Sequence, residues 1–287
     1  MPERASVPPR LFFLHVNKSG GTTLSRYLKM NVPKGACTPP DLAAGRTVTA
    51  ADASKLAHAL AQYPLVADLH LPYPYLAALR TLDSSYHAIT LLREPIQRTI
   101  SQVAAWRRAP DAELARMGPR KRAQAIDART LSLAEMAEKH ARRLHSRSAR
   151  MLAGVPLDEA VENEVELERC ALDHLATFDA VGITEHLSEF ADALAWLYAF
   201  PKPFPNLRLN VAPSPSRILE DERARAHATL VALNRADLGV YAEAQRRAFE
   251  LQWRMDLARH AATTHETATV VLAHGARWEF HGLGRCS

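Results

Sequence analysis

Residues 11–24 decide the fold of this chain, and they read Leu11-Phe12-Phe13-Leu14-His15-Val16-Asn17-Lys18-Ser19-Gly20-Gly21-Thr22-Thr23-Leu24. The first six form a short, mostly apolar and aromatic run, which is typical of a buried β-strand. The glycine pair indicates a turn, and residues 22–30 carry apolar side chains at helical spacing. The chain therefore opens with a strand, a glycine-containing turn and a helix.

The turn after this strand predicts an anion-binding site. At such a junction the backbone N–H groups point at the ligand, and the helix dipole favours negative charge. Lys18 can neutralise a phosphate. Hydroxyl donors and glycines that permit close backbone approach follow it: Ser19, Gly20, Gly21, Thr22 and Thr23. The lysine precedes the glycines, so this is not a Walker A loop, and an ordinary strand-to-helix turn is the alternative for the segment taken alone.

Strands and helices alternate outward from this opening. We expect further strands at 65–67, 87–92 and 178–183, and helices near 52–62, 75–82, 95–106, 131–143, 157–176, 188–198, 219–234 and 236–256. This alternation predicts a three-layer, P-loop-like α/β domain with a central parallel sheet. Loops rich in proline or glycine are expected at 31–50 and 200–217.

Helices outnumber strands after residue 107. We expect one domain over residues 1–255, in which 107–176 forms a mainly helical insertion or cap. Residues 107–129 have few large apolar side chains, which favours an exposed helix or a mobile segment. Residues 256–287 are rich in threonine and histidine and then in glycine, so we expect a C-terminal appendage with a strand near 270–272.

A second motif lies where the strand at 87–92 becomes a helix, and it reads Arg93-Glu94-Pro95-Ile96-Gln97-Arg98-Thr99-Ile100-Ser101. Proline suits the first position of a helix. Arg93, at a strand end, can bind a phosphate through two parallel hydrogen bonds. Ser101 lies about two helical turns further on, on nearly the same face as Arg98.

Together the two motifs resemble those of sulfotransferases that use 3′-phosphoadenosine 5′-phosphosulfate (PAPS). The first is similar to the 5′-phosphosulfate loop of the carbohydrate branch that includes heparan sulfate 2-O-sulfotransferase, with Asn17 where that branch usually has proline. The second matches Arg-[Asp/Glu]-Pro-x-x-Arg-x-x-Ser. The resemblance covers about residues 11–250. Weaker counterparts are the segments 148–154, 178–185, 209–211 and 234–241.

The resemblance implies a donor, a product and roles for particular residues. PAPS would be the sulfuryl donor and 3′,5′-adenosine bisphosphate the product. The loop from Lys18 to Thr23 would bind the 5′-phosphosulfate, with Lys18 stabilising the bridging oxygen, and Arg93 and Ser101 would bind the 3′-phosphate. We expect Arg98 to brace the loop. The acceptor would be a hydroxyl group of a carbohydrate or glycoconjugate, and no metal is expected.

Sulfuryl transfer needs a general base for the acceptor hydroxyl. His70 follows the strand at 65–67, and α/β sheets place their sites at the carboxyl ends of strands. Relatives in the 2-O-sulfotransferase branch also have a catalytic histidine between the two motifs. Asp68 is the alternative base. His58, His87 and His15 are expected to be structural, exposed or packed, because none of them follows a strand end.

Composition indicates the class of protein, the charge of its ligand and its cellular setting. A chain of 287 residues with 47% hydrophobic and 23% charged residues suits a folded domain. The net charge of +5 fits an anionic ligand, and no nucleic-acid-binding signature accompanies it. Three cysteines far apart in sequence favour a reducing, cytoplasmic setting. No apolar run is long enough for a signal peptide or a membrane span, and the sequence sets neither the acceptor nor the oligomeric state.

Two other functions fit parts of the pattern. A P-loop kinase-like phosphotransferase would need a Gly-Lys-Ser/Thr sequence, which the loop lacks. A non-catalytic module that binds nucleotides or anionic glycans would keep Lys18 and Arg93 and would need no base. His70 therefore separates an enzyme from a binding module.

Overall fold

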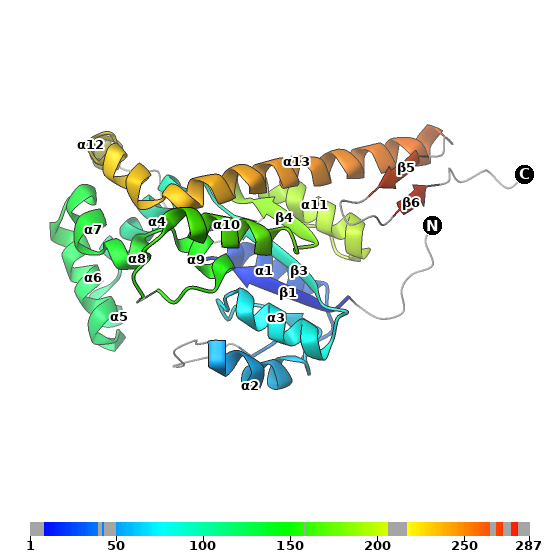
Figure 1. Cartoon of the computed structure of the whole chain (residues 1–287), viewed down its shortest axis with the longest axis horizontal. Helices are drawn as coiled ribbons and strands as arrows, with labels where there is room; N and C mark the ends of the chain where they lie inside the picture. Colours follow the sequence, from blue (N-terminus) through cyan, green and yellow to red (C-terminus); the bar gives the residue numbers. More distant parts are fainter. Residues whose placement is uncertain are drawn as a thin grey trace, which may run out of the picture.

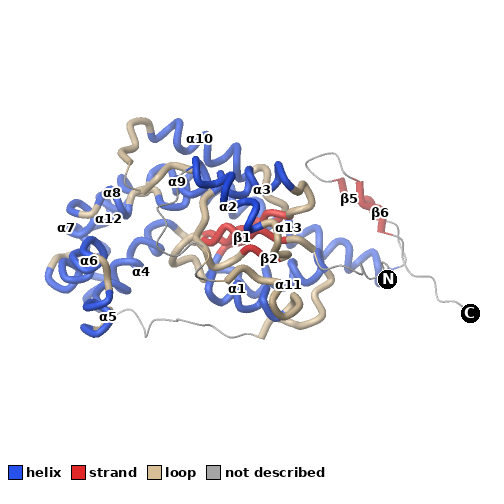
Figure 2. The backbone as a smooth tube through the Cα atoms, turned by 90° about the horizontal axis from the view of Figure 1, so that it is seen from below, coloured by secondary structure: helices blue, strands red, loops and turns tan. Residues whose placement is uncertain are grey.

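The centre of the molecule is a sheet of four parallel strands. The computed structural model describes residues 9–39, 42, 50–157, 159–205, 217–264, 268–271 and 277–280. The strands lie in the order β2-β1-β3-β4, and their bounds are β1 Leu11–His15, β2 Leu65–Val66, β3 His87–Leu92 and β4 Ala180–Ile183. Figure 2 shows these strands in the middle with helices on both sides. The predicted α/β class with a central parallel sheet is confirmed.

Successive side chains of β1 point to opposite faces of the sheet, and each face is covered by its own layer of helices. Leu11 pairs with Leu65 of β2 and with His87 of β3, so β1 is a central strand. Phe12 and Leu14 belong to one buried cluster, whereas Leu11 and Phe13 belong to another. Both faces of the sheet are therefore covered, which is why the strand is a continuous apolar run instead of an alternating one.

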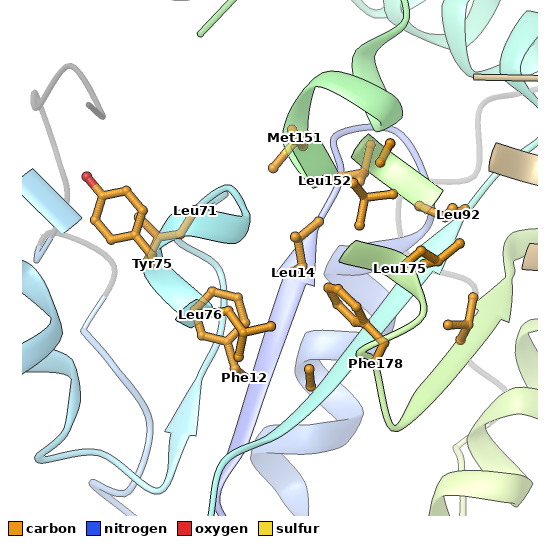
Figure 3. Close-up of a cluster of buried hydrophobic side chains, with 14 of the residues drawn as sticks. Phe12, Leu14, Leu71, Tyr75, Leu76, Leu92, Met151, Leu152, Leu175 and Phe178 are labelled. Atoms are coloured by element: carbon orange, nitrogen blue, oxygen red, sulfur yellow. The ribbon is translucent and has the colours of Figure 1, made fainter. Parts of the chain in front are cut away.

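Two sets of helices cover the two faces. The first face carries α2 Ala50–Leu60, α3 Tyr73–Leu82, α9 Arg147–Ala153, α10 Glu164–Leu175 and the start of α13 Arg235–Thr264. Figure 3 shows Leu14 of β1 beside Leu152 of α9, with Phe178 nearby. The second face carries α1 Gly21–Met30 and α11 Leu187–Tyr198.

The connections leave the sheet in opposite directions next to β1 and β3. The chain passes from β1 to β2 on one side, and from β3 to β4 on the other side. In open α/β sheets, ligands bind outside the carboxyl ends of the strands where the connections diverge. Both sequence motifs follow these two strands, so the topology places them together at one edge.

A helical subdomain has a hydrophobic core of its own. It contains α4 Pro95–Arg107, α5 Asp111–Arg116, α6 Pro119–Thr130, α7 Leu133–Lys139, α8 Ala141–Leu144 and α12 Arg217–Leu233. Ile100, Met136 and Leu230 are buried together in its core, and Figure 1 shows these helices at the left end of the molecule. The predicted cap over 107–176 is thus divided, because α9 and α10 pack on the sheet and the distant α12 joins the subdomain. Residues 107–129 include α5, most of α6 and the connections before them.

The C-terminal half ends in a long helix and a small hairpin. Helix α13 has 30 residues and runs through residue 255, where the sequence predicted a domain boundary. Met255 and Ala258 are buried, so the apolar pattern continues past that point. Strands β5 Ala268–Val271 and β6 Arg277–Phe280 pair antiparallel. None of the helices in the described ranges is long and apolar enough to cross a membrane.

Parts of two predicted loops lie outside the described residues. These are 40–41 and 43–49 in the first loop, and 206–216 in the second, which includes the sequence counterpart at 209–211. The described remainder of the first loop touches the sheet, since Cys37 forms a parallel bridge with Leu65.

Candidate active site

The loop after β1 has the tight backbone that its glycines predict. Lys18 has φ 70° and Gly20 has φ 74°, both in the left-handed region. A Cβ atom on Gly21 would lie 2.1 Å from Cδ2 of His15, so only glycine fits where α1 begins. The loop therefore folds back on the end of β1 and presents its backbone at the carboxyl edge of the sheet.

Thr184 joins this loop to the neighbouring strand. Its hydroxyl lies 2.8 Å from the carbonyl oxygen of Ser19 and 2.9 Å from that of Leu92, the last residue of β3. Sequence reasoning did not single out Thr184. Its position directly after the strand predicted at 178–183 was the available signal, because parallel strands end at the same edge of a sheet.

Three cations gather at this edge. Nη1 of Arg93 donates to the carbonyl oxygen of Lys18 at 3.2 Å. Burial lowers the pKa of Lys18, and the positive charges of Arg108 and Arg93 lower it further. Within the described residues, no carboxylate forms an ion pair with any of these three side chains. The edge therefore carries positive charge that the protein does not neutralise, and Arg108, just after α4, is a member that the sequence analysis missed.

The two carboxylates that act on Arg93, those of Glu94 and Glu185, form hydrogen bonds with other groups. Glu94 caps α4, because its side chain accepts hydrogen bonds from the backbone N–H groups of Ile96 and Gln97 at 3.1 and 2.6 Å. Glu185 accepts from the backbone N–H of Glu94 at 3.2 Å and from the hydroxyl of Tyr241 at 2.9 Å. Burial lowers the pKa of Arg93, and the charges of these two carboxylates oppose that shift. Neither carboxylate forms an ion pair with Arg93.

Hydroxyl groups in the loop fit an anionic ligand. The Oγ atom of Ser19 is buried and has no hydrogen-bond partner. Leaving a buried polar group unpaired is costly, so such an atom at a site suggests a missing partner. A phosphate oxygen in the loop would supply it. Thr22 is exposed and Thr23 is buried, with its backbone N–H donating to the carbonyl of Gly20 at 3.1 Å.

Helix α4 carries the other two polar residues of the second motif. Ser101 is half-buried about two turns into the helix. Arg98 is buried, and it donates to the carbonyl oxygen of Leu144 and to Oγ1 of Thr99, each at 3.1 Å. Its Nε atom lies 3.8 Å from Asp237. Arg98 therefore holds α4 against α8 and α13, whereas we expected it to brace the loop.

His70 is tied to the end of β1. Its Nδ1 atom lies 2.8 Å from the carbonyl oxygen of His15. A carbonyl can only accept, so Nδ1 carries the hydrogen, and Nε2 of the neutral ring is left as an acceptor. The two imidazole rings are stacked at a tilt, with centroids 4.2 Å apart. The structure thus brings His70 close to the loop that holds Lys18.

The surroundings of His70 favour its neutral form. His70 is exposed at the surface, yet enough protein surrounds the ring to lower its pKa below the ordinary value by desolvation. The charges of Arg147 and Lys121 act in the same direction, whereas the hydrogen bond with His15 and the charge of Asp68 oppose it. His15 is buried, and desolvation lowers its pKa to about 3, so it also stays uncharged.

Asp68 has a partner of its own. It forms an ion pair with Lys29 and lies 4.0 Å from Nδ1 of His15. Burial raises the pKa of Asp68, but the hydrogen bond and charge of Lys29 outweigh it, so the pKa lies below the usual value. A carboxylate held in this way is a weaker base, which favours His70 over Asp68.

The other histidines between the two motifs lie elsewhere. His58 is exposed on α2, where its Nδ1 atom lies 3.0 Å from the carbonyl oxygen of Ser54. His87 begins β3 at the amino end of the sheet and lies 3.3 Å from Asp179. In the part of the chain that is described, no group of three or more His, Cys, Asp or Glu side chains could hold a metal ion.

Comparisons with known proteins do not assign a family or a function to the chain. No family model and no curated protein matches the chain. A solved sulfotransferase from Alicyclobacillus acidocaldarius is similar over 82% of this chain and 99% of its own, with 14% sequence identity and a TM-score of 0.38. A likeness of this size assigns neither a family nor an activity, so the functional argument depends on the site itself.

Proposed function

We propose that the chain is a sulfotransferase that moves a sulfuryl group from PAPS to a hydroxyl group of an acceptor. One observation carries the proposal. Lys18, Arg93 and Arg108 form a cation cluster that has no carboxylate partner among the described residues, and His70 lies at the same sheet edge with Nε2 as an acceptor for a proton. This combination suits a doubly anionic nucleotide on one side and a proton to be removed on the other.

The donor would lie along the two motifs. The loop from Lys18 to Thr23 would bind the 5′-phosphosulfate, because its backbone faces the ligand at the start of α1 and the hydroxyl of Ser19 needs a partner. Arg93 and Ser101 would bind the 3′-phosphate from the end of β3 and from α4. Arg108 would add charge beside Lys18.

The proton goes to His70. As the acceptor oxygen attacks sulfur, Nε2 of His70 accepts the hydroxyl proton, while Nδ1–H stays bonded to the carbonyl of His15 and keeps the ring oriented. The bond between sulfur and the bridging oxygen breaks, and Lys18 stabilises the charge that develops on that oxygen. The products are the sulfated acceptor and 3′,5′-adenosine bisphosphate. No step needs a metal ion from the protein.

The acceptor is proposed to be a carbohydrate or glycoconjugate. The support is the likeness of the first motif to the carbohydrate branch of sulfotransferases, given above. A kinase-like phosphotransferase is less well supported, because Lys18 precedes the glycines and because Glu94 and Glu185, the carboxylates beside the site, are engaged in capping and in bonding to Tyr241.

Titration calorimetry with nucleotides tests the donor assignment. We expect 3′,5′-adenosine bisphosphate to bind at least tenfold more tightly than ATP or adenosine 5′-phosphate. Transfer from ³⁵S-labelled PAPS to a mixture of glycans would then identify sulfated products by mass. Preference for ATP would overturn the proposal in favour of a phosphotransferase, and tight binding of the bisphosphate with no transfer to any acceptor would favour a binding module.

A further inference from the structure

Helix α13 exposes two aromatic side chains near the middle of its length. Phe249 is 55% exposed and Trp253 is 62% exposed. Because they are four residues apart, the two side chains are neighbours on one face of the helix. Aromatic residues are enriched at protein interfaces, where their large apolar surfaces are removed from water. The face that carries them is therefore a candidate interaction surface.

The same face is exposed along most of the later helix. Its exposed residues follow one another at alternating steps of four and three positions, and we call them the α13 stripe: Ala242, Arg246, Phe249, Trp253, Asp256 and His260. Such steps match the 3.5-residue repeat of helices that pair side by side. The opposite face is buried in the protein at Ala244, Met255 and Ala258, and Figure 1 shows α13 along the upper border of the molecule. At the rise of an α-helix the stripe is about 27 Å long.

The α13 stripe is complementary to itself when a second helix runs in the opposite direction. If the two-fold axis passes Leu251, each residue lies opposite the one that is equally far from 251 on the other side. Arg246 would then face Asp256 of the partner subunit, and Phe249 would face Trp253 of the partner subunit. A parallel pair in register would instead place Arg246 against a second Arg246. The order of charges and aromatic rings thus favours an antiparallel pair of identical chains.

The charged side chains of the stripe can make these contacts. The carboxylate of Asp256 accepts hydrogen bonds from the amide of Gln252 at 3.1 Å, and among the described residues it has no cation as a partner. Arg246 pairs with two carboxylates of its own helix at 2.7 and 3.2 Å. Exposed pairs of this kind contribute little to stability, and a guanidinium group has five donors, so Arg246 can also reach Asp256 of the partner subunit. Glu250, which would lie near the axis, also forms an ion pair with Arg254, so two copies of it can approach.

A mostly apolar hollow between α11 and α13 adjoins the stripe. Ala193 of α11 and Ala248 and Phe249 of α13 contribute to its lining. The ring of Phe249 lies edge-on to that of His186, with centroids 5.5 Å apart, so one wall of the hollow is held in place. In the antiparallel pair, Trp253 of the partner subunit would lie at this hollow, because it faces Phe249. A large aromatic side chain that fills a pocket commonly dominates the binding energy of an interface.

We propose that two copies of this chain associate through the α13 stripe, as an antiparallel helix pair around a two-fold axis near Leu251. Each contact then occurs twice, as in other two-fold dimers. The inference does not depend on the proposed function, because the stripe contains none of the residues assigned to the donor or to the base. A contact limited to one helix and the hollow beside it is small for a protein interface, so the dimer should have a dissociation constant in the micromolar range.

Sedimentation velocity of the full chain over a range of concentrations tests the association. Wild type should dimerise reversibly, and Trp253→Gln and Phe249→Gln should each weaken the dimer at least tenfold. Val165→Gln is the matched control, because Val165 is 69% exposed on another helix, α10, and it should leave the dimer unchanged. A wild type that stays monomeric far above the micromolar range would overturn the inference. A dimer that both aromatic variants leave intact would overturn it as well, because another surface would then join the copies.

Exchanged charges test the antiparallel register. Arg246→Glu places two carboxylates opposite each other and Asp256→Arg places two cations opposite each other, so each change alone should weaken the dimer at least tenfold. The double variant restores opposite charges and should dimerise within threefold of wild type. An equimolar mixture of the two single variants should form a mixed dimer, because each copy supplies the charge that the other needs.

Recovery in the double variant and in the mixture cannot come from a repaired fold. Arg246→Glu also removes the ion pairs of Arg246 within α13, and Asp256→Arg does not replace them. If the double variant and the mixture both stay monomeric while the single variants keep the wild-type melting temperature, the register is wrong and the inference is overturned. If the single variants dimerise as wild type does, the stripe is not the interface.

Discussion

Lys18 is held next to two arginines although neither neighbour can stabilise its charge. Burial, Arg108 and Arg93 all lower its pKa, so the ligand-free protein is less stable with this charge than without it. Residues that oppose folding in this way are found at functional sites, because the ligand supplies the missing interaction. The same reasoning separates Lys18 from lysines that simply keep the surface soluble.

Lys18→Ala should therefore lose activity without losing stability. We expect kcat for transfer to fall roughly 10²–10³-fold, the range seen when one charge-stabilising group is removed. The melting temperature should stay the same or rise, because a repulsive charge is gone and alanine and lysine share the cost of a positive φ. Lys34→Ala, at an exposed position, is the control and should change neither quantity. Turnover near the wild-type value in Lys18→Ala would refute its role.

Arg93 should recognise the 3′-phosphate in particular. Removing a charge-assisted, two-point contact costs roughly 1.5–3 kcal/mol of binding free energy. We expect Arg93→Ala to weaken 3′,5′-adenosine bisphosphate by that amount in calorimetry, and Ser101→Ala to weaken it less. Adenosine 5′-phosphate, which lacks the 3′-phosphate, should bind both variants as it binds wild type. An equal loss for the two nucleotides would assign Arg93 to another part of the donor.

His70 should set the acid limb of the pH profile. In the proposed mechanism its neutral form is the base, and its pKa lies below the ordinary value, so the rate should fall only as the pH drops below about 6.5. His70→Ala should lower kcat by roughly 10²–10⁴-fold and remove this limb. Affinity for 3′,5′-adenosine bisphosphate should be unchanged, because the base would contact the acceptor.

Asp68→Asn is the matched test of the base assignment. The negative charge of Asp68 raises the pKa of His70, so its removal should shift the acid limb to lower pH and leave it in place. If Asp68→Asn is inactive while His70→Ala works, the carboxylate is the base. The sulfotransferase assignment would survive that result.

At the scale of elements, the junction of β1 with α1 holds both halves of the site. Gly21 begins α1 against the ring of His15, and the carbonyl of His15 orients His70. A change at the start of α1 should therefore reach His70 through a single residue of the strand, His15. The position of α1 sets the geometry of the loop and of His70 together.

Gly21→Ala should disturb stability and catalysis together. The added methyl group would lie 2.1 Å from the His15 ring, and overpacking of this kind costs roughly 1–3 kcal/mol of unfolding free energy. Denaturant titration should show that loss, and kcat should fall because the carbonyl that holds His70 moves. Gly118→Ala, where an added Cβ meets no atom within 4 Å, should leave both quantities unchanged. A stable and fully active Gly21→Ala variant would contradict the packing described here.

Local sequence patterns predicted the individual helices and strands better than they predicted which helices pack together. The opening strand, turn and helix were predictable because apolar spacing and the glycine pair are confined to one short stretch. The division of the helices was not, because α10 and α12 are both amphipathic and only long-range contacts decide that one packs on the sheet and the other on α7. Arg108 and Thr184 were missed for the same reason, since their position next to Lys18 and Ser19 arises from tertiary structure.

At the scale of the whole molecule, ligand binding should raise the free energy of unfolding. A ligand present at one hundred times its dissociation constant stabilises the folded state by about 2.7 kcal/mol. We expect 3′,5′-adenosine bisphosphate to raise the melting temperature by the corresponding amount at low salt. The rise should shrink as salt increases, because screening weakens the attraction to Lys18, Arg93 and Arg108. A rise that does not depend on salt would argue against an electrostatic site.

The length and direction of helix α13 indicate where the protein could be attached to a support or a fusion partner. Its 30 residues make it about 45 Å long. Its first turn touches the site region through Asp237, whereas its later part packs where β4 begins, since Arg247 donates to the carbonyl of Phe178. Figure 1 shows it running from the helical subdomain to the opposite end of the molecule. A bead or a fusion partner attached beyond Thr264 would therefore follow the end of α13 that is remote from the sheet edge with Lys18 and His70, and an immobilised preparation should keep the activity of the free protein.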